Sequence, residues 1–448
     1  MGNVINNLYY IVADECHYFF SDSAFNATTN LSYQFILNMY GLCRIFISAT
    51  MERFMQYIEN DFKYIKSLSV FNSVTACMNP RQIYECQADY SYINFQYFCE
   101  NTEIIELIEK FKKEKWVIFV DSKKNGIEIN ETLKNKEISS MFVDAEYSAE
   151  FSEDEVNQIV KSKKSSYQVL IATSVLDCGI SLVDNDLKNM IILADTKESF
   201  MQMLGRKRKE NDEEVLNLYV KKRTKGDFVR RLNVYQERMK ILNELNWQQP
   251  KECNVILEEI LKNERLYDCI RNISYVYQGK LQFNIFGCLQ IYHLCNHYTS
   301  IIERFDREGE SAFLYEQAEW LGLENIDEIL EEDDKKRYDA YLRKVTELID
   351  GYFIEKESNE NKERVIFTEK ENKKFKIELF EIIKQLPVSE VNAPQDKWKL
   401  VLSDVQKKDR VLAPKRFNND LMKILSLNYE MSQTKIGDEE KEYVIIKK

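Results

Sequence analysis

Long apolar segments are the first feature that this sequence lacks. No run approaches the roughly 18–20 residues that a helix needs to span a bilayer, and the N-terminus holds polar Asn3, Asn6 and Asn7 in place of a basic secretory signal. The ten cysteines are scattered and include no C-x-x-C pair. These absences predict a cytoplasmic protein whose thiols are reduced and packed in its core.

A general positive charge is also lacking, because the 448 residues carry a net charge of −12. This balance argues against a surface that is basic throughout. Phosphate affinity depends on where Lys and Arg lie, so a local basic track stays open. With 44% hydrophobic and 12% aromatic residues, the composition is that of a globular protein. The length is enough for about two to four domains.

The third absence concerns phosphate binding. Asp14-Glu15-Cys16-His17 follows the apolar run Leu8–Val12, and a strand that ends in Asp-Glu is how nucleotide-hydrolysing folds hold Mg²⁺ and orient an attacking water. The phosphate loop G-x-x-x-x-G-K-[ST], which normally lies far upstream of such a strand, is not in the sequence. We therefore expect the second half of an ATP-using machine without its first half. Apolar surface should be exposed where the missing strands would pack.

Strands and helices alternate through the first half of the chain. Residues 1 to about 75 predict a partial α/β unit, with strands at 8–13 and 44–47 and a helix near 31–40. From 102 to 224 the alternation is complete. Helices are expected at 103–113, 123–134, 153–161 and near 198–207, and strands at Val117–Val120, 139–143, Gln168–Ala172, Met190–Leu193 and 215–220. Short buried strands between helices predict a parallel sheet covered on both faces.

The second half of the chain changes to a helical apolar period, as in Val229, Leu232 and Ile241. This spacing predicts an all-helical extension to about residue 350. The polar run Ser358–Glu363 predicts a linker after it.

The C-terminal residues have a different pattern. A helix at 370–385 is followed by a second helix that Pro414 opens. Gly437-Asp438 signals a hairpin between two alternating stretches, Tyr429–Ile436 and Glu442–Ile446. A helix followed by a terminal hairpin is the outline of a winged helix.

Short motifs occur in a fixed order along the α/β part of the sequence. The segments are Asp14–His17, Ser48–Thr50, Ala172–Ile180 and Gln202–Arg208, with Val117–Ser122 between the second and the third. They resemble motifs II, III, V and VI of the superfamily 2 helicases of the DEAD/DEAH-box type, and Val117–Ser122 stands where motif IV would be. The resemblance covers roughly residues 1–224. It implies RecA-like domains, ATP and Mg²⁺ as cofactors, and a nucleic acid, DNA or RNA, as partner.

The resemblance also implies roles for residues near the nucleotide. It assigns Asp14 to Mg²⁺ and Glu15 to positioning the attacking water, while His17 would couple the nucleotide site to the neighbouring domain. Ser48 and Thr50 would transmit the nucleotide state between domains; simple capping of the strand end is the alternative. Cys16 stands where the family usually has Ala, and we interpret it as a small packing residue.

Motif V would face the nucleic acid. Thr173 offers a hydroxyl donor, and Gly179 has no side chain to block the approach of a backbone. Contacts of this kind go to phosphate and sugar and read no base sequence. We expect Thr173 and Gln202 to lie together at the carboxyl edge of the sheet.

Motif VI departs from the family pattern Gly-Arg-x-Gly-Arg. The chain reads Gly205-Arg206 followed by Lys-Arg-Lys, so the second glycine is absent. On one continuous helix Gln202, Arg206 and Lys209 would share a face at i, i+4 and i+7. Gln202 and Gly205 carry over as nucleotide-binding residues and Arg206 as an arginine finger, whose planar fork Lys cannot copy. Either Arg208 or Lys209 would be the second finger.

Two further features have competing interpretations. His293 and His297 lie four residues apart, a spacing that would suit a metal site, but an aromatic-lined helix interior is the favoured interpretation because no acidic third ligand stands nearby. The cluster Lys221–Arg223 with Lys225, Arg230 and Arg231 is either a solvated helix start or a phosphate track.

These patterns lead to two functional hypotheses. The first is the C-terminal part of an ATP-dependent helicase that is inactive alone and needs an upstream chain to supply the phosphate loop. The second is a non-catalytic nucleic-acid-binding or scaffold protein with a degenerate helicase fold. Both share one predicted division: 1–78 as a partial first RecA-like domain, 79–224 as a second RecA-like domain, 225–357 as a helical extension and 364–448 as a small winged-helix-like domain.

Overall fold

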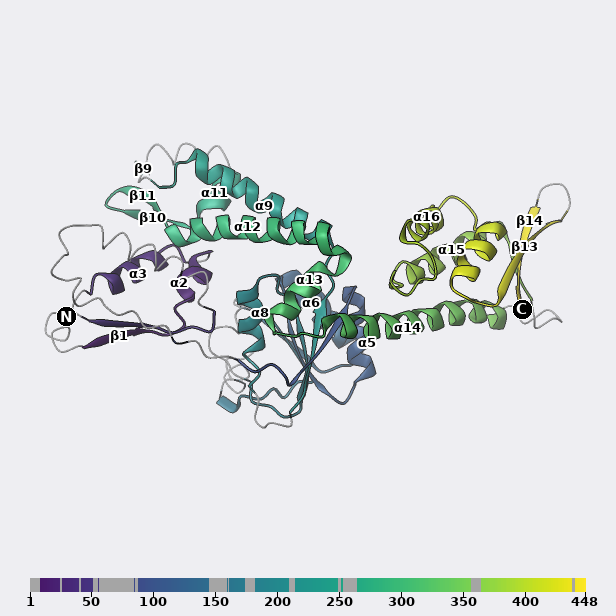
Figure 1. Cartoon of the computed structure of the whole chain (residues 1–448), viewed down its shortest axis with the longest axis horizontal. Coiled ribbons are helices and arrows are strands. Elements are labelled where there is room, and N and C mark those ends of the chain that lie inside the picture. Colours follow the sequence, from purple (N-terminus) through teal and green to yellow (C-terminus); the bar gives the residue numbers. More distant parts are fainter. Residues whose placement is uncertain are drawn as a thin grey trace. The chain divides into compact units, whose positions relative to one another are not determined.

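The computed structural model describes residues 9–24, 26–39, 42–50, 55, 84, 88–144, 159, 161–173, 182–208, 214–248, 251–252, 264–355, 364–436 and 440–448. The chain divides into two compact units, Met1–Leu323 and Glu324–Lys448, whose elements are labelled in Figure 1. No helix of this described part is long and apolar enough to cross a membrane. The division into four domains stays a prediction.

Two parallel strands, β1 (Tyr10–Ala13) and β2 (Cys43–Phe46), begin the first unit. Their inner face packs on α2 (Tyr18–Ser21) and α3 (Thr29–Leu37) through a core that includes Phe20, Tyr33 and Phe46. The short helix η1 (Asp22–Ala24) lies between these helices in sequence. The strand–helix–strand order predicted for the partial α/β unit is therefore confirmed.

The outer face of this strand pair is apolar and exposed. Tyr10 is 61% exposed, Val12 46%, Ile45 40% and Ile47 49%. Val12 and Ile45 are register partners, so these side chains line one face of the pair. The exposed apolar surface expected beside absent strands is thus present on the described residues.

A six-stranded parallel sheet forms the centre of the first unit. Its spatial order is β3-β8-β7-β4-β6-β5, and every neighbouring pair is parallel. The strands are β3 (Ile93–Phe98), β4 (Lys115–Phe119), β5 (Ser140–Val143), β6 (Val169–Ala172), β7 (Leu187–Ile192) and β8 (Leu216–Lys221). This confirms the predicted RecA-like parallel sheet. The predicted helix 153–161 lies mostly outside the described residues.

The helices between these strands are α5 (Asn101–Lys110), α6 (Lys123–Asn135) and α8 (Lys197–Leu204). Polar residues at the strand ends start them: Ser122 Oγ accepts from Asn125 N and caps α6, and Thr196 Oγ1 accepts from Ser199 N and caps α8. One face of the sheet packs with α5 and α6 around fully buried side chains such as Trp116 and Ile118. These caps start each helix directly beyond the edge of the sheet.

The helical extension contains α9 (Lys225–Glu244), α11 (Glu264–Ile270), α12 (Ile285–Glu308), η6 (Gly309–Ser311) and α13 (Ala312–Trp320). It also contains a small antiparallel sheet that the helical period did not predict, with order β10-β11-β9. Its strands are β9 (Lys251–Glu252), β10 (Ser274–Tyr277) and β11 (Lys280–Phe283). Gln278 and Gly279 have φ of 50° and 74°, the backbone of a tight hairpin turn. The Gln-Gly pair between two short alternating segments is the sequence feature that could have predicted this hairpin.

Helix α12 connects the first strand pair to the six-stranded sheet. At its N-cap, the buried Asn284 donates through Nδ2 to Asn26 O (2.9 Å) and Thr29 Oγ1 (2.8 Å). Farther along, the Tyr298 hydroxyl donates to Asp195 Oδ2 at 3.0 Å, directly after β7. Beside α9 in Figure 1, this 24-residue helix spans roughly 36 Å at the usual rise per residue. One straight element therefore contacts both parts of the first unit.

The second unit has a helical layer and a three-stranded antiparallel sheet of order β12-β14-β13. Its elements are α14 (Ile326–Glu355), β12 (Arg364–Phe367), α15 (Glu369–Ile383), α16 (Gln395–Val405), the π-helix η7 (Arg416–Met422), β13 (Tyr429–Ile436) and β14 (Glu440–Lys447). Residues 414–424 are helical throughout, with η7 at their centre. The outline of a winged helix is present, with α16 as an additional helix. The tip of its hairpin, Gly437-Asp438, lies outside the described residues.

Candidate nucleotide site and nucleic-acid edge

Strand β1 delivers Asp14 and Glu15 to its carboxyl end, where both side chains are exposed. Cys16 N donates to Ile47 O at 2.9 Å, which holds this acidic turn against the end of β2. Glu15 has φ of 51°, a left-handed conformation that is uncommon outside glycine and concentrated at functional sites. The carboxyl end of a parallel strand is where ligands of such sheets bind.

His17 joins the acidic turn to its surroundings. Its Nδ1 lies 2.7 Å from Ser48 Oγ and 3.2 Å from Glu15 Oε2. Burial lowers the pKa of His17; the carboxylate of Glu15 opposes this, and the nearby charge of Arg206 lowers the pKa further. His17 is therefore neutral at pH 7, and Arg206 lies within electrostatic reach of the acidic turn.

Proton NMR can test this state because the chain has only three histidines. We expect the His17 resonance, identified by its loss in His17→Gln, to titrate below the ordinary value of 6.5. The neutral ring then contributes stability that is fully present above about pH 6.5 and is lost as the pH falls through the folded pKa. The wild type should lose more stability than His17→Gln on acidification, whereas a His17 midpoint at or above 6.5 contradicts the assignment.

Ser48, Thr50 and Cys16 complete the end of the strand pair. Thr50 N donates to Ser48 Oγ at 3.0 Å, so Ser48 both caps the chain after β2 and contacts His17. Thr50 Oγ1 is buried without a hydrogen-bond partner. Cys16 is 1% exposed, and burial raises the pKa of its thiol to about 12, which makes it a packing residue rather than a nucleophile.

Motif VI does not form one continuous helix, contrary to the expectation from its spacing. Helix α8 ends at Leu204, and Gly205 N donates back to Met201 O at 2.9 Å. Beyond it, Arg206 O accepts from Leu182 N at 2.7 Å and Arg208 N donates to Leu182 O at 3.1 Å. Arg206 and Arg208 therefore belong to a short extended bridge, and the i, i+4, i+7 face does not exist.

The expectation that Gln202 lies at the carboxyl edge beside Thr173 is also wrong. Thr173 directly follows β6 and is at that edge. A crossover helix runs antiparallel to the strands, so the last turn of α8, with Gln202, lies toward the opposite edge. In agreement, Leu182, beside Arg206, precedes the start of β7.

The basic residues after Arg206 have different environments. Lys207 is 3% exposed and paired with Glu214, so it has a structural role. Arg208 is exposed. Lys209 lies outside the described residues, so the assignment of Arg208 or Lys209 as the second finger stays a prediction.

Unpartnered polar atoms of motif VI fit a nucleotide. Gln202 Nε2 and Arg206 Nε are buried donors without a hydrogen-bond partner, and such groups are costly unless a ligand satisfies them. No group of three or more His, Cys, Asp or Glu side chains forms a metal site among the described residues. A single exposed carboxylate such as Asp14 still suits Mg²⁺, which protein sites hold through one or two carboxylates, waters and substrate phosphates.

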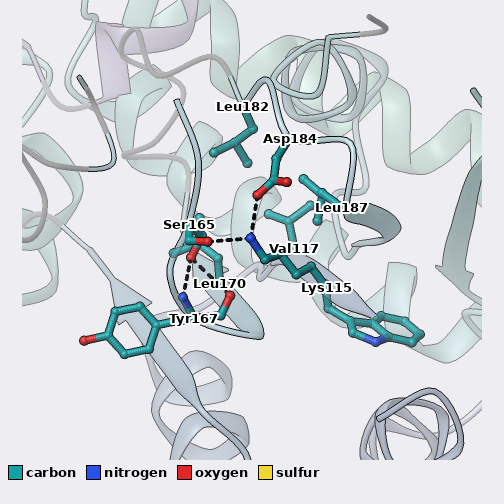
Figure 2. A pocket seen from close by; sticks show the side chains of 9 residues that line it. Lys115, Val117, Ser165, Tyr167, Leu170, Leu182, Asp184 and Leu187 are labelled. Atoms are coloured by element: carbon teal, nitrogen blue, oxygen red, sulfur yellow. Dashed lines mark hydrogen bonds and ion pairs between the residues drawn. The ribbon is translucent and has the colours of Figure 1, made fainter. Parts of the chain in front are cut away.

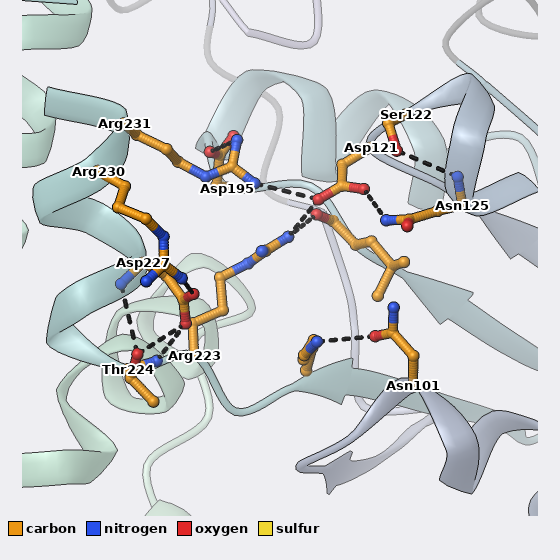
Figure 3. A network of polar contacts seen from close by, with 12 residues as sticks. Asn101, Asp121, Ser122, Asn125, Asp195, Arg223, Thr224, Asp227, Arg230 and Arg231 are labelled. Atoms are coloured by element: carbon orange, nitrogen blue, oxygen red, sulfur yellow. Dashed lines mark hydrogen bonds and ion pairs between the residues drawn. The ribbon is translucent and has the colours of Figure 1, made fainter. Parts of the chain in front are cut away.

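The carboxyl edge of the six-stranded sheet carries a polar network that sequence analysis missed (Figure 3). Asp121, after β4, accepts from Arg223 at 3.2 Å and from Arg231 at 3.1 Å. Arg231 also pairs with Asp195, after β7, at 2.8 Å. Burial would raise the pKa of Asp121, but these guanidinium groups and Asn125 outweigh it and lower the pKa. An Asp shortly after each of two predicted strands is the sequence feature that could have predicted this network.

This network decides the interpretation of the basic cluster at 221–231. Arg223 and Arg231 are held by Asp121, and Lys225 pairs with Asp306 at 2.5 Å. Arg230 pairs with Asp227. Arg223 and Arg231 fasten α9 to the sheet edge, Lys225 joins α9 to α12, and Arg230 pairs within α9. These four cations already have acidic partners, which disfavours a phosphate track. Thr173, at the neighbouring strand β6, is the described motif V residue at this edge, and Gly179 lies outside the described residues.

His293 and His297 do not converge on one point. The ring of His293 packs edge-on against Phe20, with 5.4 Å between ring centroids. His297 donates from Nε2 to Asp195 O at 2.7 Å. The aromatic-lined helix interior is therefore the correct interpretation of this pair.

A small cavity lies at the amino ends of β4 and β7 (Figure 2). Lys115 Nζ reaches into it and donates to Asp184 Oδ2 at 2.9 Å and to Ser165 O at 2.8 Å. It is barely large enough for one water molecule, and it is on the edge opposite to Thr173. This cavity is not a ligand site.

Comparison with known proteins gives one family match. Residues 99–209 match the family described as the helicase conserved C-terminal domain. No curated protein matches the chain.

Solved structures resemble the chain only in part. The crystal structure of the DUF1998 helicase MrfA bound to DNA shares 16% identity and a TM-score of 0.32 over 64% of this chain and 44% of that chain. S. cerevisiae Dbp5 bound to RNA and ADP BeF3 shares 15% identity and a TM-score of 0.33 over 49% of this chain and 57% of that chain. The chain therefore spans less than two thirds of the length of either protein.

Proposed function

We propose that the chain is the C-terminal part of a superfamily 2 helicase, which uses ATP to translocate on or unwind nucleic acid. The match of residues 99–209 to the helicase conserved C-terminal domain is the starting point for this proposal. One observation supports this most. The acidic turn after β1 and Arg206 after α8 come from different parts of the first unit, yet the charge of Arg206 reaches His17. This electrostatic proximity supports assigning both groups to one nucleotide site.

In this proposal the nucleotide binds between the acidic turn and motif VI. Asp14 holds Mg²⁺ and Glu15 orients the attacking water. Arg206 neutralises charge on the phosphates, with Gln202 and Gly205 beside it, and the buried free donors of Gln202 and Arg206 would gain partners. His17 and Ser48, which are already hydrogen-bonded, couple this site to the neighbouring strand end, and Thr50 extends the link.

The nucleic acid would lie along the carboxyl edge near Thr173 and Gly179 and be held by its backbone. Because α9 covers the part of this edge at Asp121 and Asp195, we place the nucleic acid over β6 and β5.

In this proposal a segment that carries a phosphate loop completes the site. An upstream chain with the motif G-K-[ST] would pack on the exposed face formed by Tyr10, Val12, Ile45 and Ile47 and bring the loop to Asp14. The described free cysteines fit a reducing compartment such as the cytoplasm.

A non-catalytic nucleic-acid-binding or scaffold protein is the second candidate, and the missing phosphate loop favours it. The retained pair Asp14-Glu15 and the facing Arg206 disfavour it, since a scaffold needs neither a water-orienting carboxylate nor an arginine finger.

Steady-state hydrolysis of ATP by the chain alone, with single-stranded nucleic acid present, tests this proposal. We expect negligible turnover, because no lysine and glycine-rich loop neutralise the β- and γ-phosphates. Turnover of about 1 s⁻¹ or more, the range of phosphoryl-transfer enzymes, would contradict the dependence on a partner.

A further inference from the structure

The C-terminal segment 364–448 of the second unit has a charge balance unlike that of the whole chain. Residues 364–448 hold 18 Lys and Arg against 14 Asp and Glu, a net charge of +4, while the complete chain carries −12. The remaining residues therefore carry −16. A basic C-terminal segment in an acidic protein suggests a surface for a polyanion.

Four of the cations of this segment that have no ion pair lie on one helix and the turn before it. Residues 414–424 bury Phe417 and Leu421 in the core and expose Lys415, Asn419 and Lys423, which are four residues apart. Side chains about one helical turn apart share a face. The turn between α16 and this helix exposes Lys408 and Arg410. We name the set Lys408, Arg410, Lys415, Asn419 and Lys423 the basic surface.

Nearby acids do not neutralise the basic surface. Arg416 holds Asp404 and Asp420 at 2.5 Å each, and Lys407 also pairs with Asp404. Asp409 is an exposed carboxylate in the same turn. Within the described residues, the four cations of the basic surface have no ion pair, so their charge is available to a ligand.

Buried polar groups fix the shape of this turn. Lys376 of α15 is 2% exposed, and its Nζ donates to Lys407 O at 2.7 Å and Arg410 O at 2.9 Å. One helical turn earlier, Asn372 is fully buried; its Oδ1 accepts from Leu412 N at 2.6 Å and its Nδ2 donates to Leu412 O at 3.3 Å. Burying a lysine is costly unless the backbone satisfies it. The fold thus holds the basic turn in one conformation, which lowers the ordering cost of binding.

A second polar pair fixes the helix against the hairpin. Asn418 Nδ2 donates to Met431 O at 2.8 Å and its Oδ1 accepts from Met431 N at 2.7 Å. The neighbouring Asn419 is exposed. An exposed asparagine between two lysines is the side-chain set that reads an adenine edge while the cations contact phosphates.

We propose that the basic surface binds double-stranded DNA, with the 414–424 helix in the major groove and Lys408 and Arg410 on the adjoining phosphates. The B-form major groove admits an α-helix, whereas the major groove of duplex RNA is too narrow for one. This site is separate from the nucleotide site and from Thr173, and it needs neither ATP nor a complementing chain.

Fluorescence anisotropy with a blunt, labelled DNA duplex and the full-length chain, without nucleotide, tests the proposal. The triple variant Lys408→Ala, Lys415→Ala, Lys423→Ala should bind about tenfold or more weakly and lower the slope of log K against log salt by about 3. The matched control is Lys370→Ala, Lys374→Ala, Lys384→Ala, which removes equal charge from the exposed face of α15 and should bind like the wild type. Asn419→Ala should leave the salt slope unchanged, because it removes no charge.

Three results would overturn the proposal. These are no duplex binding by the wild type, equal losses in both triple variants, or wild-type binding to duplex RNA as tight as to duplex DNA. Absence of ATP hydrolysis under all conditions would contradict the proposed helicase function. It would not affect this binding test, which uses no nucleotide.

Discussion

Arg206→Ala is expected to lower nucleic-acid-stimulated ATP hydrolysis by about 10³–10⁵-fold in a complex of this chain with a segment that carries the phosphate loop. The charge of Arg206 acts on His17, and the Nε of Arg206 is buried without a hydrogen-bond partner. Because this donor has no hydrogen bond to break, it can bind a phosphoryl group as negative charge develops there in the transition state. Single-turnover hydrolysis measures the effect on the chemical step.

Three further variants make this result specific. Arg206→Lys keeps the charge and loses the planar fork, so it should recover little of the rate. Arg208→Ala and Lys209→Ala should differ from each other, and the one with the larger loss identifies the second finger. Hydrolysis by the Arg206→Ala complex within tenfold of the wild type would exclude Arg206 as an arginine finger.

Glu15→Gln should remove about 10²–10⁴-fold of turnover in the same complex while nucleotide binding stays nearly unchanged. The substitution keeps the shape of a side chain that is 57% exposed, and it removes the carboxylate that orients the water. Equilibrium binding of a labelled nucleotide, beside the hydrolysis rate, separates the two effects. If binding and hydrolysis fall together, Glu15 contributes to affinity and the water-orienting role is wrong.

The strands and the acidic motif were predictable from the sequence because their signals are local. An apolar run before Asp14-Glu15 predicted β1, and the alternation from 102 to 224 predicted the order of strands and helices in the sheet. The resemblance to helicases rested on motifs at strand ends, and the family match at 99–209 agrees with it.

The end of α8 was not predictable from helical spacing. Gln202 and Arg206 are four residues apart, which favours one helix face, but the helix stops at Leu204. The backbone of Leu182, which is distant in sequence, forms hydrogen bonds with the backbone of Arg206 and Arg208. A long-range backbone pair decided the conformation here, and local propensity carries no information about it.

The connection through α12 was hidden for the same reason. Asn284 contacts Asn26 and Thr29, more than 250 residues away. Tyr298 reaches Asp195, about a hundred residues away. The helical period of α12 identified its apolar side but not its partners, so the sequence could not show that one helix contacts both parts of the first unit.

The most direct test of the central claim is the hydrolysis rate of this chain mixed with a segment that carries the G-K-[ST] loop, compared with each component alone. The account predicts negligible rates for the separate components and nucleic-acid-stimulated turnover for the mixture that depends on Glu15 and Arg206. A mixture that is active and whose rate is unchanged by both Glu15→Gln and Arg206→Ala would contradict it.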